Sequence, residues 1–158
     1  MIEQEIYNKL KEHFGDAIVE LKEAPPSDPF IQVNPERLQD ICLYLRDEGD
    51  MLFDYLSNLS GMDLAENLGV VYHLYSMKYK HTIVLKVTVS KENPNVPSVE
   101  RIWRTADWHE REAYDLFGVI FEGHHNLIRI LNPYDWEGYP LRKDYKTPEE
   151  YHGIKVPY

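Results

Sequence analysis

Acidic, basic and histidine side chains of the kinds that carry out acid–base chemistry gather among large aromatic residues in the last third of the chain. The run Glu110 to Gly118 reads Glu-Arg-Glu-Ala-Tyr-Asp-Leu-Phe-Gly, and Gly123-His124-His125 follows it. These charges cannot all face water while neighbours such as Trp103 and Trp108 reach a core. Buried charge is tolerated only where partners satisfy it. The region is therefore either a reactive site or a polar interface.

Metal binding is one chemistry to weigh for this region. The segment from His109 begins like the zinc-peptidase pattern His-Glu-x-x-His, but Ala113 stands where the second histidine belongs. The sequence also lacks the Glu-x-x-His pairs of di-iron bundles. His124 and His125 are adjacent, and adjacent side chains point to opposite faces of a regular strand. The sequence therefore predicts no metal site.

A stand-alone acid–base enzyme is a second chemistry. Glu112, Asp115 and His124 are the residue types that such an enzyme, for example a hydrolase, would use. No nucleophile motif, phosphate loop or dinucleotide fingerprint accompanies them, because no glycines have the required spacing. The hydrolase stays an alternative. A structural charge network at a protein interface is the favoured interpretation.

Length, cysteine content and charge narrow the class of protein. A chain of 158 residues has the size of a single domain, and its one cysteine, Cys42, allows neither an internal disulfide nor an iron–sulfur cluster held by this chain alone. Residues 1–66 hold 15 Asp or Glu against five Lys or Arg, so the net charge of −10 lies there. Such a surface repels nucleic acid. We expect a soluble intracellular protein without a signal peptide or membrane span.

Helices are expected where apolar residues recur at helical spacing. Residues 2–14 carry an apolar residue every fourth position and end at a glycine. A second helix begins at Asn34-Pro35, ends at Gly49 and carries one apolar stripe, which makes Cys42 a core residue. Asp107 and Glu110 fit an acidic capping box, which predicts a helix over 108–117. Ser98 would cap a further short helix over 99–103.

Strands are expected where β-branched and aromatic residues cluster. A short polar link before residue 82 predicts that the last two strands form an antiparallel hairpin. The proline-rich segment 24–29 is expected to be a loop. The fold class is thus α+β, with a small mixed or antiparallel sheet flanked by helices. The expected strands are 17–21, 30–33, 51–58, 70–77 and 82–89.

One domain and one extended segment are expected. Residues 1–146 form a single α+β domain in this interpretation. Residues 147–158 are polar and lack apolar periodicity, so we expect an extended C-terminal tail that lies on a partner.

The charges of the Glu-Arg-Glu region are expected to pair. Arg111 and Asp115 stand four residues apart and can pair along the helix. At least one carboxylate of this helix should meet an arginine from elsewhere, and Arg129 and Arg142 are the nearest candidates. Either guanidinium suits planar bidentate pairing.

The same residues carry a resemblance to a known family. Glu110 to Phe121, then Gly123-His124, Arg129-Ile-Leu131 and Pro140 to Tyr145, resemble the signature of the 30 kDa-type (C-type) subunit of respiratory complex I, an NADH:quinone oxidoreductase. The J-type subunit of the plastoquinone-reducing relatives belongs to the same family. The specific match covers residues 94–146. Three positions depart from the family's usual pattern: His125, Ile128 and Tyr139.

The resemblance implies a non-catalytic scaffold subunit in the peripheral arm of a proton-translocating NADH:quinone oxidoreductase. Such a subunit binds no cofactor itself, while NADH, FMN, iron–sulfur clusters and quinone belong to the parent complex. It packs against the 49 kDa-type (D-type) subunit, near the cluster-carrying subunits. The assembly would place it peripherally, on the cytoplasmic side of the inner membrane, as part of a hetero-oligomer.

Ten residues receive expected roles in an interface or structural charge network. Four lie on the helix, three complete the network or reach a partner, two glycines allow turns, and one histidine caps a loop. In that order they are Glu110, Arg111, Glu112 and Asp115; Arg129, Arg142 and Asp144; Gly118 and Gly123; and His124.

Overall fold

A five-stranded mixed sheet forms the centre of the protein in the computed structural model, which describes residues 1–157. Its strands are β1 (Ile18–Ala24), β2 (Ser27–Val33), β3 (Tyr55–Asp63), β4 (Asn67–Tyr75) and β5 (Thr82–Ser90), in the order β1-β2-β5-β4-β3. The strands β2 and β5 pair in parallel, and the other neighbours pair antiparallel. The predicted α+β class and the predicted hairpin of β4 and β5 are confirmed.

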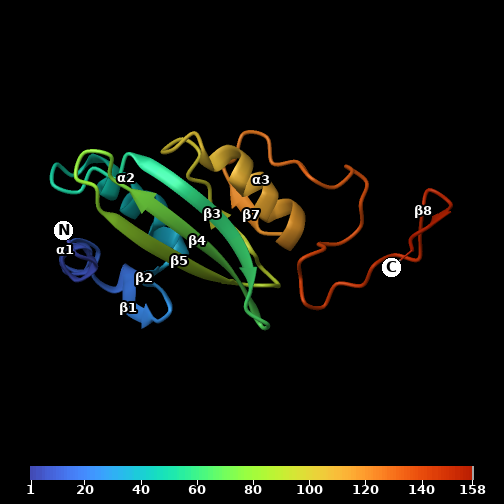
Figure 1. Cartoon of the computed structure of the whole chain (residues 1–158), viewed down its shortest axis with the longest axis horizontal. Coiled ribbons are helices and arrows are strands. Elements are labelled where there is room, and N and C mark those ends of the chain that lie inside the picture. Colours follow the sequence, from blue (N-terminus) through green and yellow to red (C-terminus); the bar gives the residue numbers. More distant parts are fainter. Residues whose placement is uncertain (158) are drawn as a thin grey trace.

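Two helices lie at the N-terminal end of the body (Figure 1). Helix α1 spans Glu3–Phe14 and buries Ile6 and Leu10. Helix α2 spans Leu38–Asp47 and follows a 3-10 turn over Pro35–Arg37, where the Asn34 side chain accepts the N–H of Glu36. The predicted stripe of α2 is wholly buried, so its apolar periodicity correctly located the core face. Cys42 lies in that stripe.

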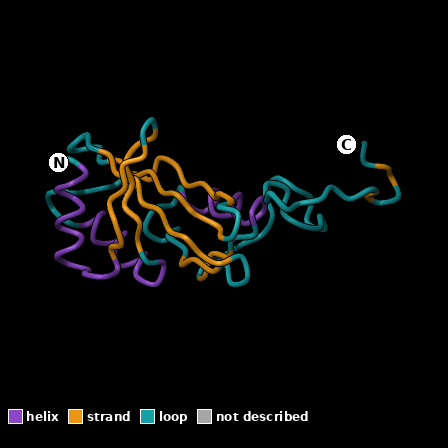
Figure 2. The backbone as a smooth tube through the Cα atoms, turned by 90° about the horizontal axis from the view of Figure 1, so that it is seen from below, coloured by secondary structure: helices purple, strands orange, loops and turns teal. Residues whose placement is uncertain are grey.

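The core lies on one face of the sheet, as strand alternation requires. In β4, four alternate side chains are at most 1% exposed, while Val71, His73 and Tyr75, which point to the other face, are half-buried. Figure 2 shows the sheet running through the body, with helices α1 and α2 packed along it. The buried set of β4 is Leu68, Val70, Tyr72 and Leu74.

The far end of the body holds the third helix. Helix α3 spans Ala106–Phe117 and packs along β3, where the Thr105 hydroxyl donates to the Leu56 carbonyl. The short strands β6 (Asn95–Pro97) and β7 (Ile120–Glu122) flank it in sequence and pair in parallel. This pairing brings the chain before α3 and the chain after it to one place.

Several predicted boundaries were wrong because tertiary contacts set them. The strand expected over 51–58 begins at Tyr55, since Met51 and Phe53 are buried in a turn before it. The expected loop 24–29 shrinks to a tight turn, and Ser27 already begins β2. The expected helix 99–103 is a run of turns. Helix α3 starts at Ala106 rather than at 108.

The chain after β7 leaves the body as an outstretched arm, here residues 127–157 (Figures 1 and 2). Near its end, β8 (Glu150–Tyr151) and β9 (Ile154–Lys155) form a small hairpin. The Asp135 carboxylate accepts from the Tyr151 hydroxyl at 2.8 Å and lies 2.6 Å from His152 Nε2, which fixes this hairpin on the arm. No helix within residues 1–157 is long and apolar enough to cross a membrane.

Candidate functional site

Asp115 lies on the inner side of α3, and donors surround its carboxylate. Oδ2 accepts the backbone N–H groups of Ile130, Leu131 and Asn132 at 3.1, 2.7 and 2.8 Å. Oδ1 accepts from the Arg129 guanidinium at 2.8 Å and from the Asn132 amide at 3.0 Å. Burial opposes ionisation, yet the donors outweigh it and hold the pKa of Asp115 at about 2. One carboxylate thus fixes the start of the arm to the helix.

Arg129 extends that attachment along the arm. Its guanidinium also donates to the carbonyl oxygens of Trp136 and Gly138, at 2.7 and 2.9 Å. Its Cζ lies 5.3 Å from the centre of the Tyr139 ring, within range of a cation–π interaction. Arg129 therefore joins Asp115 to the part of the arm that turns back toward the body.

Arg142 and Gly118 fasten the returning arm. The Arg142 Nε donates to the Phe117 carbonyl at 2.6 Å, and its Cζ lies 4.7 Å from the Tyr139 ring centre. Gly118 ends α3 in the left-handed conformation, with φ at +76°. A Cβ there would lie 2.6 Å from both an Arg142 nitrogen and a Tyr139 ring carbon. Glycine is needed both for the turn and for this close approach.

Glu110 points into the body and holds the chain that precedes α3. It accepts the Ser98 hydroxyl at 2.6 Å and the Val99 backbone N–H at 2.7 Å, and it is fully buried. The two hydrogen bonds lower the pKa of Glu110, but burial outweighs them and raises it to about 7. The predicted capping box of Asp107 and Glu110 was wrong, because the buried Val99 N–H needs an acceptor and Glu110 supplies it.

Three of the expected network residues lie elsewhere. Arg111 does not pair with Asp115; it donates to the Ile128 and Arg129 carbonyls, both at 3.1 Å, because Asp115 faces inward. Glu112 is exposed on the outer side of α3, where the helix has no packing partner within the described chain. Asp144 is exposed as well. Neither carboxylate belongs to a buried network.

His124 follows the turn at Gly123 and lies beneath the N-terminal half of α3. Its side chain is fully buried. Nε2 lies 3.0 Å from the Asp107 carbonyl oxygen, and Nδ1 accepts the Asn126 N–H at 3.0 Å. The ring therefore carries its proton on Nε2 and donates to Asp107. The turn itself needs Gly123, whose φ is +84°. His124 thus ties the loop after β7 to the first turn of α3.

His125 does not point away from His124. The two rings stack with their centres 5.2 Å apart, because the loop at this point is a turn rather than a strand. Glu100 receives both the His125 N–H at 2.8 Å and the His125 Nδ1 contact at 2.7 Å. The expectation that adjacent histidines diverge was wrong. Glu100, Asp107, His124 and His125 place four possible metal-ligand atoms within 4.8 Å of one another.

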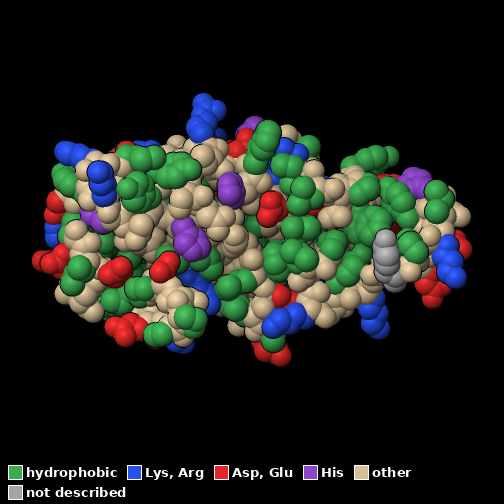
Figure 3. Space-filling model, in the orientation of Figure 1, with side chains coloured by type: hydrophobic (Ala, Val, Ile, Leu, Met, Phe, Trp, Pro, Cys, Tyr) green, Lys and Arg blue, Asp and Glu red, His purple; other side chains and the backbone are tan. Residues whose placement is uncertain are grey.

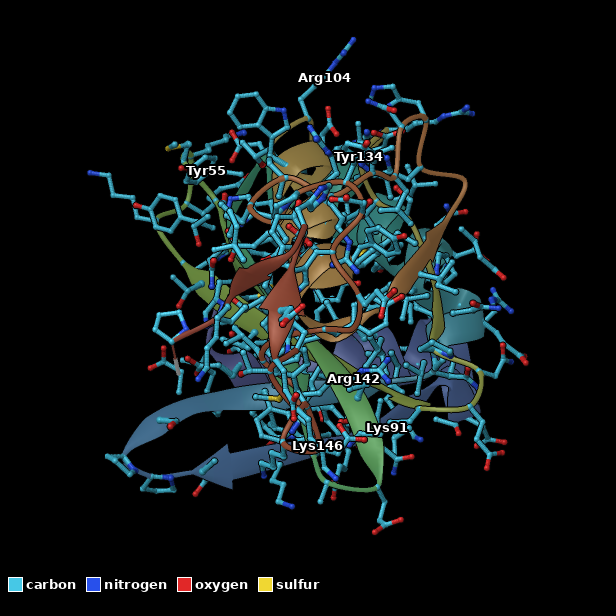
Figure 4. The ribbon with its side chains drawn as sticks, turned by 90° about the vertical axis from the view of Figure 1, so that its right-hand side faces the viewer. Tyr55, Lys91, Arg104, Tyr134, Arg142 and Lys146 are labelled. Carbon is cyan, nitrogen blue, oxygen red and sulfur yellow. The ribbon has the colours of Figure 1, made fainter. Side chains whose placement is uncertain are left out.

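Sequence reasoning missed Glu100 and Asp63, and it gave Ser98 the role of a helix cap rather than that of a partner for Glu110. Ser98 and Glu100 come from the turn before α3, and Asp63 comes from the end of β3. Asp63 accepts the Lys143 N–H at 2.8 Å and pairs with Lys91 at 3.0 Å, and the Lys143 bond is the main cause of its pKa of about 2. Figure 4 shows Lys91, Arg142 and Lys146 on the same side of the molecule. No local pattern marks these residues, because their partners lie far away in sequence.

Arg129 and Arg142 of the arm are turned inward, while its other charged side chains and many of its large apolar side chains are exposed. Tyr134 is 92% exposed and Leu131 is 64% exposed, although Asp115 binds the backbone of Leu131. Figure 3 shows hydrophobic side chains gathered over the arm. A surface of this kind is typical of a protein–protein contact. The other exposed apolar residues of this region are Trp108, Ile120, Ile128, Leu141 and Ile154.

The geometry does not assemble the alternative acid–base site. Asp115 is held by five donors, and His124 is bound through both ring nitrogens to Asp107 and Asn126. Glu112 lies on the outer side of α3. A general base needs a free lone pair aimed at the proton it takes. The donors and acceptors instead hold segments of the chain together.

Comparison with known proteins agrees with this architecture. Residues 31–151 match the family described as "Respiratory-chain NADH dehydrogenase, 30 Kd subunit". The C subunit of the NADH-quinone oxidoreductase of Chloroherpeton thalassium is 51% identical over 154 residues, which cover 96% of this chain and 64% of that protein. The corresponding C subunit from Chlorobium phaeobacteroides is 47% identical over 156 residues, which cover 96% of this chain and 93% of that protein.

Two solved structures share the fold. A trypsin-resistant fragment (1-134) of Nqo5 superposes with a TM-score of 0.63 at 28% identity, over 76% of this chain and 97% of that one. A chain of an archaeal respiratory membrane complex, the membrane-bound sulfane sulfur reductase, superposes with a TM-score of 0.73. The superposition covers 90% of this chain and 85% of that one. At 23% identity, that second likeness shows the fold alone.

Fold and site together define a class of α+β protein in which a compact body holds an outstretched arm through buried charge. The chain belongs to the 30 kDa subunit family of the respiratory-chain NADH dehydrogenase, because the family match covers most of its length. Its curated relatives are subunits of NADH-quinone oxidoreductase, and the predicted resemblance is confirmed.

Proposed function

We propose that this chain is a non-catalytic scaffold subunit of the peripheral arm of a proton-translocating NADH:quinone oxidoreductase. In this proposal NADH, FMN, the iron–sulfur clusters and quinone are bound by other subunits. Electrons pass through those subunits, and this chain holds them in position on the cytoplasmic side of the membrane. Residues 1–146 act as one domain, and residues 147–158 continue the arm over a partner.

One observation carries the proposal: the Asp115 carboxylate binds the backbone at the start of the arm and so holds this part of the arm in place with Leu131 outward. Asp115 accepts the N–H groups of residues 130–132, and this segment presents Leu131. An isolated extended segment loses conformational entropy without burying apolar surface. A preorganised segment lowers the cost of binding a partner. The arm is therefore suited to bind a partner protein.

The 49 kDa-type (D-type) subunit is the partner proposed for the arm, with the cluster-carrying subunits nearby. The surface it would meet combines exposed aromatic and aliphatic side chains with exposed charged side chains such as Arg104 and Asp144. Aromatic residues and arginines are enriched in such interfaces. The exposed Glu112, on the outer side of α3, is positioned to contact the partner rather than this chain.

Assembly in the cell tests the proposal. A tagged chain carrying Leu131→Ser and Tyr134→Ser is expressed in place of the wild type, and the complex is purified from membranes. The matched control carries Val19→Ser and Met77→Ser, which remove exposed apolar side chains at the other end of the body. We expect less of the arm variant, and an unchanged amount of the control, to co-purify with the cluster-carrying subunits.

Turnover distinguishes a scaffold from a catalytic subunit. Complexes that do contain the arm variant are expected to keep the wild-type NADH:quinone turnover per complex and unchanged cluster redox signals. Normal assembly of the arm variant would contradict the docking role. Normal assembly of a Glu112→Ala variant with lost turnover would instead favour a catalytic carboxylate.

A further inference from the structure

We propose that Glu100, Asp107, His124 and His125 form a binding site for one divalent transition-metal ion of the zinc class. These residues come from the turn before α3, the first turn of α3 and the loop after β7. Their candidate ligand atoms all lie within 4.8 Å of one another. The site does not depend on the proposed scaffold function.

The first observation is unbalanced negative charge. Three carboxylates converge on the buried His124 ring: its Nε2 lies 3.0 Å from Asp107 Oδ1, 3.5 Å from Glu100 Oε2 and 4.0 Å from Glu110 Oε2. Within residues 1–157 these carboxylates form ion pairs with histidine only. Glu100 and Glu110 are buried and Asp107 is partly buried, and carboxylates held this close together need a cation or a proton. A divalent cation supplies the missing charge.

The second observation is an unused ligand atom. Asp107 Oδ1 is buried and accepts no hydrogen bond within the described chain. It lies 3.0 Å from His124 Nε2, but the ring N–H is directed at the Asp107 carbonyl oxygen, also at 3.0 Å. Buried carboxylate oxygens are normally paired. Here the free oxygen points at the same place as Glu100 and His124.

The types of ligand and the distances between them fit tetrahedral coordination of a metal ion. With bonds of about 2.0 to 2.2 Å, tetrahedral ligands lie about 3.3 to 3.6 Å apart. The contacts from His124 to Asp107 and Glu100, at 3.0 and 3.5 Å, are close to that spacing, and His125, 2.7 Å from Glu100, must move outward. Two imidazoles with two carboxylates favour Zn²⁺ and its neighbours over Mg²⁺ or Ca²⁺.

The site has an entrance. Glu100, Asp107 and His125 line a cavity of about 350 Å³ together with Arg101 and Arg104. Arg104 points outward, away from the body, so its guanidinium does not neutralise the carboxylates (Figure 4). His125 is exposed and can swing toward an entering ion.

Binding requires one proton to move. His124 now holds its proton on Nε2, because Nδ1 accepts the Asn126 N–H at 3.0 Å. A ligand nitrogen must give up its proton, so the neutral ring carries it on Nδ1 when Nε2 binds the ion. Two donors would then face each other, and the Asn126 bond must open. The turn at Gly123 lies in open space, which leaves room for this movement.

Calorimetric titration of the full chain with ZnCl₂ is the first test. We expect one Zn²⁺ per chain, and at least about tenfold weaker binding for His125→Ala. His152→Ala is the matched control, since His152 is equally exposed and lies 2.6 Å from the Asp135 carboxylate outside the site. We expect the control to bind as the wild type does. His125 is exposed, and its backbone N–H bond to Glu100 survives the substitution, so we expect the fold to stay intact.

Two further readouts separate the proposed site from loose surface binding. Tetrahedral Co²⁺ should give an intense visible absorption band in the wild type and in His152→Ala, but not in His125→Ala or Glu100→Gln. Zn²⁺ should speed hydrogen exchange at the Asn126 amide. Absence of binding at micromolar Zn²⁺, equal affinity in His125→Ala, or loss of binding in His152→Ala would each overturn the proposal.

Discussion

Replacement of Asp115 by asparagine should destabilise the protein strongly without changing its shape. The amide keeps one acceptor oxygen but turns an –NH₂ group toward donors, either the Arg129 guanidinium or the N–H groups of residues 130–132. The pKa of about 2, lowered from 3.8, corresponds to about 2 kcal/mol of stabilisation at neutral pH. Leaving the largely buried Arg129 unpaired raises the expected loss to about 3 to 5 kcal/mol.

Urea unfolding of the full chain at pH 7, followed by tryptophan fluorescence, measures this loss. For a domain of this size the same loss lowers Tm by roughly 6 to 20 °C. Asp144→Asn is the matched control, because Asp144 is exposed, and it should stay within about 0.5 kcal/mol of wild type. A loss below about 1 kcal/mol for Asp115→Asn would refute the reasoning.

A double-mutant cycle checks the cause of that loss. If an unpaired guanidinium is the main cost, Arg129→Met should be less destabilising in the Asp115→Asn background than in the wild type, by about 1.5 to 3 kcal/mol. Additive effects of the two substitutions would show that the backbone N–H groups, and not Arg129, carry the energy.

Four shorter predictions follow from the same contacts. Gly118→Ala should cost more than about 1 kcal/mol in urea unfolding, because it combines a positive φ with a 2.6 Å approach to Tyr139; wild-type stability would contradict this. Glu112→Ala should leave unfolding unchanged but reduce recovery of the chain in the purified complex; a stability loss would place Glu112 in the body. Acid should remove the stabilisation by Asp115 and Asp63 as pH falls from about 5 to 2, since both folded pKa values, about 2, lie below the unfolded ones; a flat urea-midpoint profile there would argue against it. Limited trypsin digestion should trim the arm and spare the body, because Lys143 and Lys146 of the arm are exposed; early cuts within the sheet, seen by mass spectrometry, would be inconsistent.

Periodic stretches of sequence predicted their structure well. The stripe of α2 and the β-branched runs of β4 and β5 each signal which side is buried, because side-chain direction repeats with a fixed period in helices and strands. These elements appear where expected. Boundaries were less predictable. Residues 51–54 lie outside the strand because the chain turns there and buries Met51 and Phe53 in the core. No local sequence pattern predicts this turn.

The charged region was only half predictable. Sequence alone indicated that its carboxylates need partners and named Arg129 as a candidate, which does pair with Asp115, but other partners were misassigned. Arg111 and Asp115 have ideal spacing for an ion pair along the helix. Asp115 is buried, however, and pairs with Arg129 instead. Glu110 looked like a helix cap and instead binds the chain before α3. Glu100 gave no signal at all, since its role depends on His125, which lies 25 residues away.

The sequence by itself determined the class of fold, the core stripes and the family, because these depend on residue types at fixed local spacing. Only the tertiary structure decided which charge meets which partner, and which of them face water. Which buried charges pair depends on how the turn before α3, helix α3 and the loop after β7 pack together. Residue spacing along the chain does not predict that packing. The Glu-Arg-Glu run thus divides into an inward Glu110, an Arg111 bound to the arm and an outward Glu112.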